Sequence, residues 1–239
     1  MAIFYRDSID STNLEAGRLM AAGAVADMDV VQAGFQTLGR GQRGNIWYSL
    51  EGENLLFSII CFHQKLKATQ FFEINQRASV AVVEYLLTRG IKARIKWPND
   101  ILVGTKKISG ILIENTILQQ HISTSIVGIG INLNASVFPL GLQQTATSVY
   151  LENPGDYSTN TELEKFMECF RKEWYYDRFQ VKQHYIKHLF AINQKLQFRH
   201  NGIVFTAINA GVDNQGRLML IMPNRRTAYF SFKEIEWVL

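Results

Sequence analysis

One short segment of the chain combines backbone flexibility with permanent positive charge. Residues 36–47 read Gln-Thr-Leu-Gly-Arg-Gly-Gln-Arg-Gly-Asn-Ile-Trp. Glycines let backbone N–H groups approach an anion closely, and the guanidinium groups of Arg40 and Arg43 fit phosphate or carboxylate oxygens. A glycine-rich turn with solvated arginines explains the same composition. Because ordering three glycines without core contacts costs conformational entropy, we favour a loop that stays disordered until a phosphorylated ligand neutralises its arginines.

A second segment brings an amide, a carboxylate and two lysines close together along the chain. Lys96-Trp-Pro-Asn-Asp100 leaves a predicted strand at a turn, with Asn99 and Asp100 at its tip, and Lys107-Ile-Ser-Gly110 returns on the neighbouring strand. A polar hairpin with surface lysines is the simpler interpretation. The arginine loop and Lys107 together supply the cations that an adenylate-forming site requires, because negative charge builds up on the α-phosphate and on the attacking carboxylate.

A third polar group stands at the start of the first predicted helix. Thr12 and Glu15 fit a capping box at this point, and apolar residues follow at helical spacing. Ser11, Thr12 and Asn13 either only begin the helix or also bind the polar head of a ligand at its N-terminus.

Other catalytic signatures are absent or incomplete. The loop satisfies G-x-G-x-x-G, but no helical period follows it, which argues against a dinucleotide-binding fold. The sequence contains no H-R-D, D-F-G or G-x-x-x-x-G-K-[ST], which excludes kinase and Walker-type sites. His184 and His188 stand four residues apart on a predicted helix, a spacing that can bind zinc, but no third ligand is evident. We therefore expect solvated histidines there and no metal site.

The elements that must position these residues form an α+β pattern. Strands are predicted over residues 3–5, 30–35, 54–62, 93–97, 101–103, 108–114 and 123–132. Helices are predicted from residue 12, over 68–88 and over 162–190, where the aromatic residues of 166–185 should belong to the core. The short links after residue 101 predict a mixed or antiparallel sheet. Short strands over 195–199, 203–210, 218–222 and 228–232 then predict a small C-terminal barrel.

The composition bounds the class of protein. The chain has 239 residues, of which 47% are apolar, and a formal net charge of +4, which allows one large domain, or a medium domain with a small one. Cys61 and Cys169 lie in unrelated contexts and predict buried free thiols. No apolar run approaches the length of a membrane span, and charged residues interrupt any signal peptide near the start. We therefore expect a cytoplasmic protein without a membrane partner.

Four blocks of this sequence resemble those of the biotin–protein ligases. In the order of that family, they are Asp10–Asn13, Gln36 with Gly39–Trp47, Lys96–Asp100 with Lys107–Gly110, and Gly128–Asn132. The resemblance implies a mixed or antiparallel central sheet flanked by helices, similar to that of class II aminoacyl-tRNA synthetases. It also implies a catalytic domain over residues 1–192 and a small SH3-like β-barrel over residues 193–239.

The resemblance implies a biotin–[biotin carboxyl-carrier protein] ligase. Biotin would be activated by ATP and Mg²⁺ as biotinyl-5′-AMP and then transferred to a lysine of a biotin carboxyl carrier domain. Catalytic roles would fall to Lys107, Arg40, Lys96 and Asp100. Biotin would contact Ser11, Thr12, Asn13, Gln36, Arg40, Gly41, Gln42, Lys107 and Gly110. ATP or the adenylate would contact Arg40, Arg43, Trp47, Asn99, Lys107 and Asn132.

The chain departs from the family pattern at two points. Family members often have arginine where this chain has Gln42 and Asn45, so we expect weaker retention of the adenylate. Because the motifs start at residue 10, we expect none of the DNA-binding domain that precedes the bifunctional members, and no nucleic-acid partner. Either a monomer or a homodimer is compatible with the sequence.

Two alternative functions remain open. A lipoate–protein ligase would use the same adenylation chemistry on a related fold. A single-strand nucleic-acid module would use the C-terminal barrel, where bases could stack on Phe198, Phe205, Tyr229 and Phe230.

Overall fold

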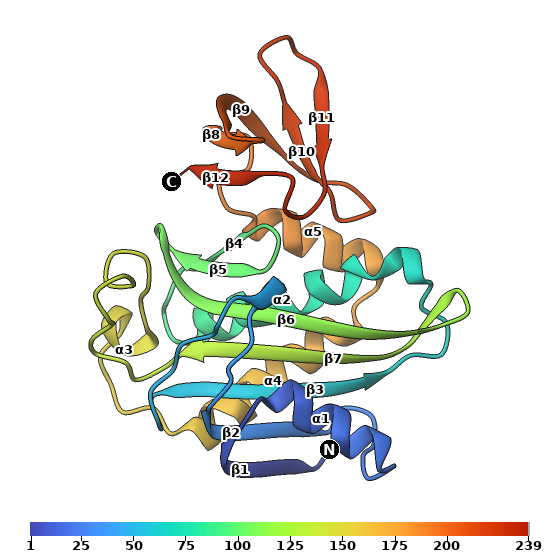
Figure 1. Cartoon of the computed structure of the whole chain (residues 1–239), viewed down its shortest axis with the longest axis vertical. Coiled ribbons are helices and arrows are strands. Elements are labelled where there is room, and N and C mark those ends of the chain that lie inside the picture. Colours follow the sequence, from blue (N-terminus) through green and yellow to red (C-terminus); the bar gives the residue numbers. More distant parts are fainter. Residues whose placement is uncertain (239) are drawn as a thin grey trace.

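Seven strands form one mixed sheet that runs through the larger part of the molecule (Figure 1). The computed structural model describes residues 1–238, except for the side chain of Arg43. The strand order is β1-β2-β3-β7-β6-β5-β4. The strands are β1 (Ile3–Ile9), β2 (Val30–Gln36), β3 (Asn54–Phe62), β4 (Arg94–Lys96), β5 (Asp100–Val103), β6 (Lys106–Leu118) and β7 (His121–Asn132). Only β1 and β2 pair in parallel, so the predicted mixed sheet is confirmed.

The helices divide between the two faces of this sheet. They are α1 (Thr12–Ala21), α2 (Phe72–Thr88), α3 (Val149–Glu152), α4 (Thr159–Tyr175) and α5 (Arg178–His188), with single 3₁₀ turns at Gln42–Gly44 and Ala68–Gln70. Figure 1 shows α1 in front of the sheet and α2 and α4 behind it. Alternate residues of each strand therefore face different surroundings.

The two faces differ in the size of their cores. Behind the sheet, Leu55, Phe57 and Ile59 of β3 join the helices in one large apolar cluster. In front, Ile60 of β3 packs beneath Ala16 of α1 in a much smaller cluster. The rest of the front face is free to form a binding cleft.

The C-terminal residues form a second, antiparallel sheet that is not a closed barrel. Its order is β11-β10-β9-β8-β12, with β8 (Lys195–His200), β9 (Ile203–Val212), β10 (Leu218–Ile221), β11 (Thr227–Phe230) and β12 (Glu236–Val238). The predicted barrel is therefore wrong as to closure. The edge strands β11 and β12 have only four and three residues and lie at opposite edges of this sheet. Within residues 195–238 they do not pair with each other, so the sheet stays open.

Three local predictions need correction. Ser11, and not Thr12, occupies the N-cap position of α1, without a capping hydrogen bond from its side chain, and Glu15 pairs with Arg18 instead of closing a capping box. His188 is buried against Glu84, with 3.1 Å between His188 Nε2 and Glu84 Oε1, so it is not a solvated histidine. Among the aromatic residues of the last two helices, Phe166, Phe170 and Tyr185 belong to the core as expected, but two are exposed because they lie where the helices meet: Tyr175 and Phe179.

The two cysteines follow the sequence more closely. Both cysteines are free thiols, Cys61 buried and Cys169 half-buried, and burial raises the pKa of each. His184 Nδ1 lies 3.1 Å from Glu173 Oε2. Within residues 1–238, no group of three or more His, Cys, Asp or Glu side chains could hold a metal ion. No helix in the same range is long and apolar enough to cross a bilayer.

Candidate active site

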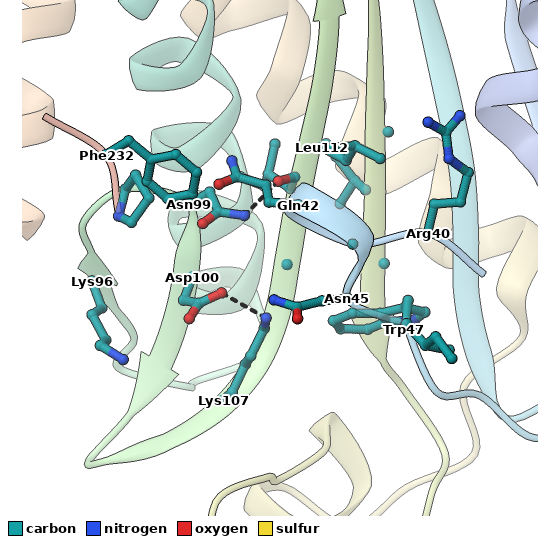
Figure 2. A pocket seen from close by; sticks show the side chains of 18 of the residues that line it. Arg40, Gln42, Asn45, Trp47, Lys96, Asn99, Asp100, Lys107, Leu112 and Phe232 are labelled. Atoms are coloured by element: carbon teal, nitrogen blue, oxygen red, sulfur yellow. Dashed lines mark hydrogen bonds and ion pairs between the residues drawn. The ribbon is translucent and has the colours of Figure 1, made fainter. Parts of the chain in front are cut away.

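A cleft of about 660 Å³ opens on the front of the sheet (Figure 2). Its walls come from the start of α1, from strands β6 and β7, from the glycine–arginine segment and from the C-terminal sheet. We call residues 39–47 the flap. Most of the predicted site residues line the cleft: Ser11, Thr12, Asn13, Gln36, Arg40, Gly41, Gln42, Trp47, Lys96, Asn99, Asp100, Lys107 and Gly110.

One end of the cleft, which we call the head end, is polar but uncharged. The backbone N–H of Thr12 donates to Gln36 Oε1 over 2.7 Å, and the hydroxyl of Thr12 lies 3.1 Å from the same oxygen. Ser58 Oγ lies 2.7 Å from Thr12 Oγ1 and 2.6 Å from Asn13 Oδ1. Ser11, Thr12 and Asn13 are all buried. This end therefore presents fixed hydrogen-bonding groups to a neutral polar ligand.

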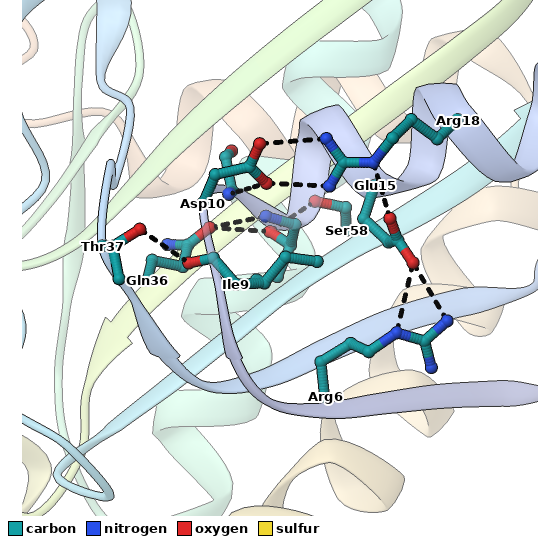
Figure 3. A network of polar contacts seen from close by, with 10 residues as sticks. Arg6, Ile9, Asp10, Glu15, Arg18, Gln36, Thr37 and Ser58 are labelled. Atoms are coloured by element: carbon teal, nitrogen blue, oxygen red, sulfur yellow. Dashed lines mark hydrogen bonds and ion pairs between the residues drawn. The ribbon is translucent and has the colours of Figure 1, made fainter.

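Ion pairs behind the head end hold the start of α1 in place (Figure 3). Arg18 contacts both oxygens of Asp10 at 2.9 and 2.8 Å, and it also contacts Glu15, which pairs in turn with Arg6. The hydrogen bond from Arg18 lowers the pKa of Asp10 to about 2. The ion pair between Asp10 and Arg18 therefore keeps its charges well into the acidic pH range.

The flap folds over the cleft as a short hairpin of its own. Gly41 N–H donates to Asn45 O over 2.7 Å, and Trp47 N–H donates to Gly39 O over 3.0 Å. Arg40 leaves the flap toward β6, where its Nη2 lies 3.0 Å from Glu114 Oε1. The predicted adenylate contact of Arg43 lies outside the described side chains. Two buried polar atoms of the flap, Gln42 Oε1 and Trp47 Nε1, have no hydrogen-bond partner among the described residues.

The floor beneath the flap consists of glycines that make room for two side chains. A Cβ atom at Gly130 would stand 2.5 Å from Trp47 Cε2, and one at Gly110 would stand 2.8 Å from Trp47 Cζ3. The indole of Trp47 therefore lies directly on the sheet. A Cβ atom at Gly128 would stand 2.2 Å from Asn13 Oδ1. Gly128 and Gly130 belong to the block Gly128–Asn132, in which the family resemblance implies a role only for Asn132.

The far end of the cleft is charged. Lys107 Nζ lies 2.6 Å from Asp100 Oδ1 and 5.4 Å from the centroid of the Trp47 ring. Lys96 stands opposite Asp100 in the β4–β5 ladder, and Asp100 stands opposite Gly110 in the β5–β6 ladder. Burial lowers the pKa of Lys96; the charge of Asp100 opposes this shift and that of Lys107 adds to it.

A bulge in β6 aims Lys107 into the cleft. The β5–β6 register shifts between Ile101 and Leu102, so Ile108 is an extra residue on β6. Lys107 and Gly110 are three residues apart and would face opposite sides of a regular strand. The extra residue puts both on the front of the sheet and leaves Ile108 in the core.

Two predicted adenylate contacts use their side chains to brace the structure. Asn99 lines the cleft, but its Nδ2 donates to Ile111 O over 2.7 Å. Asn132 is not among the residues that line the cleft, and its Nδ2 donates to Thr147 O over 2.9 Å. Thr147 directly follows Ala146, which forms an isolated parallel bridge with Lys107.

The C-terminal sheet contributes a wall that sequence reasoning missed. Phe232, Lys233, Ile235, Glu236 and Trp237 line the cleft. Trp237 Nε1 donates to Trp97 O over 3.1 Å, which fixes the sheet beside the charged end. No local motif marks these residues, because only the packing of the two sheets brings them to the cleft.

Comparisons with known proteins agree along most of the chain. Residues 4–132 match the profile of the Biotin/lipoate A/B protein ligase family. The chain is 30% identical over 226 residues to the bifunctional ligase/repressor BirA of Bacillus spizizenii, covering 91% of this chain and 69% of that protein. It is 25% identical over 223 residues to the biotin--[acetyl-CoA-carboxylase] ligase of Mycobacterium tuberculosis, covering 90% and 81%.

Two solved structures share the fold. The biotin protein ligase from Aquifex aeolicus in complex with biotin and ATP aligns with a TM-score of 0.79 at 23% identity, over 98% of this chain and 97% of that chain. The biotin protein ligase from Leishmania major in complex with biotinyl-5-AMP aligns with a TM-score of 0.68 at 22% identity, over 97% and 99%. At such low identity this likeness concerns the fold alone.

Proposed function

Since the chain belongs to the Biotin/lipoate A/B protein ligase family, we propose that it is an ATP-dependent biotin–protein ligase. The single observation that carries the proposal is one cleft with an uncharged hydrogen-bonding end and a cationic end, joined by a glycine floor under the flap. Biotin matches this arrangement, because its ureido ring carries a carbonyl and two N–H groups and its tail ends in a carboxylate.

The polar head end favours biotin over lipoate. The dithiolane ring of lipoate has no N–H or carbonyl group, so it would offer no hydrogen bond to Gln36 or to the buried polar groups of Thr12 and Asn13. An enzyme for lipoate is expected to line this end with apolar side chains.

The first step joins biotin to AMP. A carboxylate oxygen of biotin attacks the α-phosphorus of ATP, the bond from that phosphorus to the bridging oxygen breaks, and pyrophosphate leaves. Lys107 stands at the cationic end, where we propose that it stabilises the carboxylate and the α-phosphate as charge develops. Arg40, Arg43, Trp47, Asn99 and Asn132 are proposed contacts of the nucleotide.

The second step transfers biotin to a lysine of a biotin carboxyl carrier domain. The ε-amine attacks the acyl carbon, the bond from that carbon to the AMP oxygen breaks, and the amine loses a proton. Asp100 contacts Lys107, and Lys96 stands opposite Asp100; both are proposed to position the phosphate and the incoming amine. The lowered pKa of Lys96 makes its neutral form, which can accept a proton, more accessible.

Mg²⁺ is proposed as a companion of ATP, where it neutralises phosphate charge. It commonly binds one or two carboxylates together with substrate phosphates. Asp100 fits that requirement, because it is the carboxylate beside Lys107 in the cleft.

Several further expectations belong to the same proposal. We propose a catalytic domain over residues 1–192 and an SH3-like domain over residues 193–239, a division supported by the start of the second sheet at Lys195. The proposed enzyme acts in the cytoplasm as a monomer or homodimer, without a nucleic-acid or membrane partner. The two indole–backbone contacts of Trp97 and Trp237 indicate that the two parts work as one unit.

Incubation with biotin, ATP, Mg²⁺ and an apo-carrier domain tests the proposal. We expect the mass of the carrier to increase by one biotinyl group, and no increase when ATP is left out. A parallel assay of pyrophosphate exchange with biotin or lipoate distinguishes the two acids. Exchange with lipoate but not with biotin would contradict the proposal.

A further inference from the structure

The carboxylate of Glu114 receives two donors from opposite sides. Its Oε1 lies 3.0 Å from Nη2 of Arg40 on the flap. Its Oε2 accepts a hydrogen bond of 2.7 Å from Nδ2 of Asn13 at the start of α1. Glu114 lies on β6 just outside the residues that line the cleft. It therefore joins the flap to the head end without lining the cleft itself.

The same hydrogen-bonded chain continues into the head end. Asn13 Nδ2 also lies 3.4 Å from Leu112 O, and Asn13 Oδ1 accepts from Ser58. Both N–H groups of Asn13 thus have an acceptor, which fixes the orientation of its amide. Gly128 closes the space behind it, because even a Cβ atom there would collide with Asn13 Oδ1.

The chain of contacts also returns to the base of the flap. Ser58 contacts Thr12, and Thr12 contacts Gln36, the last residue of β2 before the flap. Arg40 lies four positions later in the sequence. The network therefore reaches the flap at two points, at Gln36 just before it and at Arg40 within it, and it passes through the residues that would hold the ligand head.

We propose that Glu114 is a positioning residue for the ligation reaction, one that orients Asn13 at the head end and holds the flap closed through Arg40. This inference rests on the proposed function. A carboxylate is needed because it offers an acceptor to each of two donors, whereas glutamine offers one acceptor and one donor. The neutral isostere must therefore leave an N–H group facing either Arg40 or Asn13.

The burial of the two contacts determines which one survives in Glu114→Gln. Asn13 is buried, whereas the side chains of Arg40 and Glu114 are 42% and 37% exposed. The buried contact is the more costly to lose, so the glutamine carbonyl faces Asn13 and its amide nitrogen faces Arg40. Glu114→Gln therefore releases the flap, and Glu114→Ala releases both partners.

Limited proteolysis of the ligand-free protein tests the contact with the flap. Trypsin cleaves after arginine, and we expect the fragment that ends at Arg40 to form about threefold faster in Glu114→Gln than in the wild type, as the loss of a partly exposed ion pair predicts. Glu164→Gln is the matched control, because Glu164 is exposed on α4 and forms no hydrogen bond or ion pair among the described residues. It should be cleaved at the wild-type rate.

Steady-state kinetics test the contact with the head end. We expect KM for biotin to rise roughly tenfold in Glu114→Ala, with KM for ATP changed far less, and to change less than about twofold in Glu114→Gln. Wild-type cleavage of Glu114→Gln, or an unchanged KM for biotin in Glu114→Ala, would overturn the inference. The proteolysis needs no turnover, so its outcome is independent of the mass assay that tests the proposed function.

Discussion

The glycine floor makes a substitution of one methyl group informative. In Gly130→Ala, the new Cβ atom would stand 2.5 Å from Trp47 Cε2 and 2.7 Å from Trp47 Nε1. Non-bonded carbon atoms pack at about 3.5–4.0 Å. The indole must therefore withdraw from the sheet by roughly 1 Å. The indole would then lose its contact with Gly110 and its cation–π contact with Lys107.

The expected effect falls on catalysis and not on the fold. Gly130 lies in β7 without a positive φ, so alanine fits its backbone, and the side chain that must move belongs to the flap. A displacement of about 1 Å in a catalytic site can cost on the order of 100-fold in rate. We therefore expect kcat/KM for adenylate formation to fall about 100-fold, equivalent to about 2.7 kcal/mol.

Pyrophosphate exchange and thermal melting measure these two effects separately. Gly141→Ala is the matched control, because a Cβ atom at Gly141 meets nothing within 4 Å. The double variant Gly130→Ala/Trp47→Ala should be no worse than Trp47→Ala, since the collision has then been removed. Wild-type exchange in Gly130→Ala, or additive losses in the double variant, would refute the reasoning.

Three further predictions follow from the two ends of the cleft. Lys107→Ala should lower biotin-dependent pyrophosphate exchange about 10²–10³-fold with an unchanged far-UV circular dichroism spectrum, and full activity would show that its role is misassigned. Ser58→Ala removes a buried hydroxyl that contacts Asn13, so urea unfolding should show a loss of about 1–3 kcal/mol and KM for biotin should rise more than KM for ATP; the reverse order would contradict the assignment. Asp100→Asn removes the negative charge that raises the pKa of Lys96, so this pKa should fall further. The limb of the pH–rate profile of biotin transfer that depends on neutral Lys96 should then move to lower pH. Movement to higher pH would exclude Lys96 as the group responsible.

Much of the fold follows from local sequence patterns. The apolar run of residues 54–62 coincides with β3, and the break at Gly90 follows the end of α2 at Thr88. The flap and the Lys96–Asp100 turn were also visible, because glycine, proline and charged residues have local conformational and chemical preferences that need no tertiary partner. These features, together with the resemblance of four blocks, were enough to predict the class of reaction.

The tertiary structure decided which residues meet. The bulge at Ile108 brings Lys107 and Gly110 to one face of the sheet. The two-residue period of a regular strand predicts opposite faces for them. The role of Glu114 depends on a partner 101 residues away, and the C-terminal wall depends on the contact between Trp237 and Trp97, 140 residues apart. Local propensity carries no information about such distant pairs, because their geometry is set by sheet register and by the packing of one sheet against the other. The sequence by itself therefore determined the chemical groups, and the packed fold determined their arrangement.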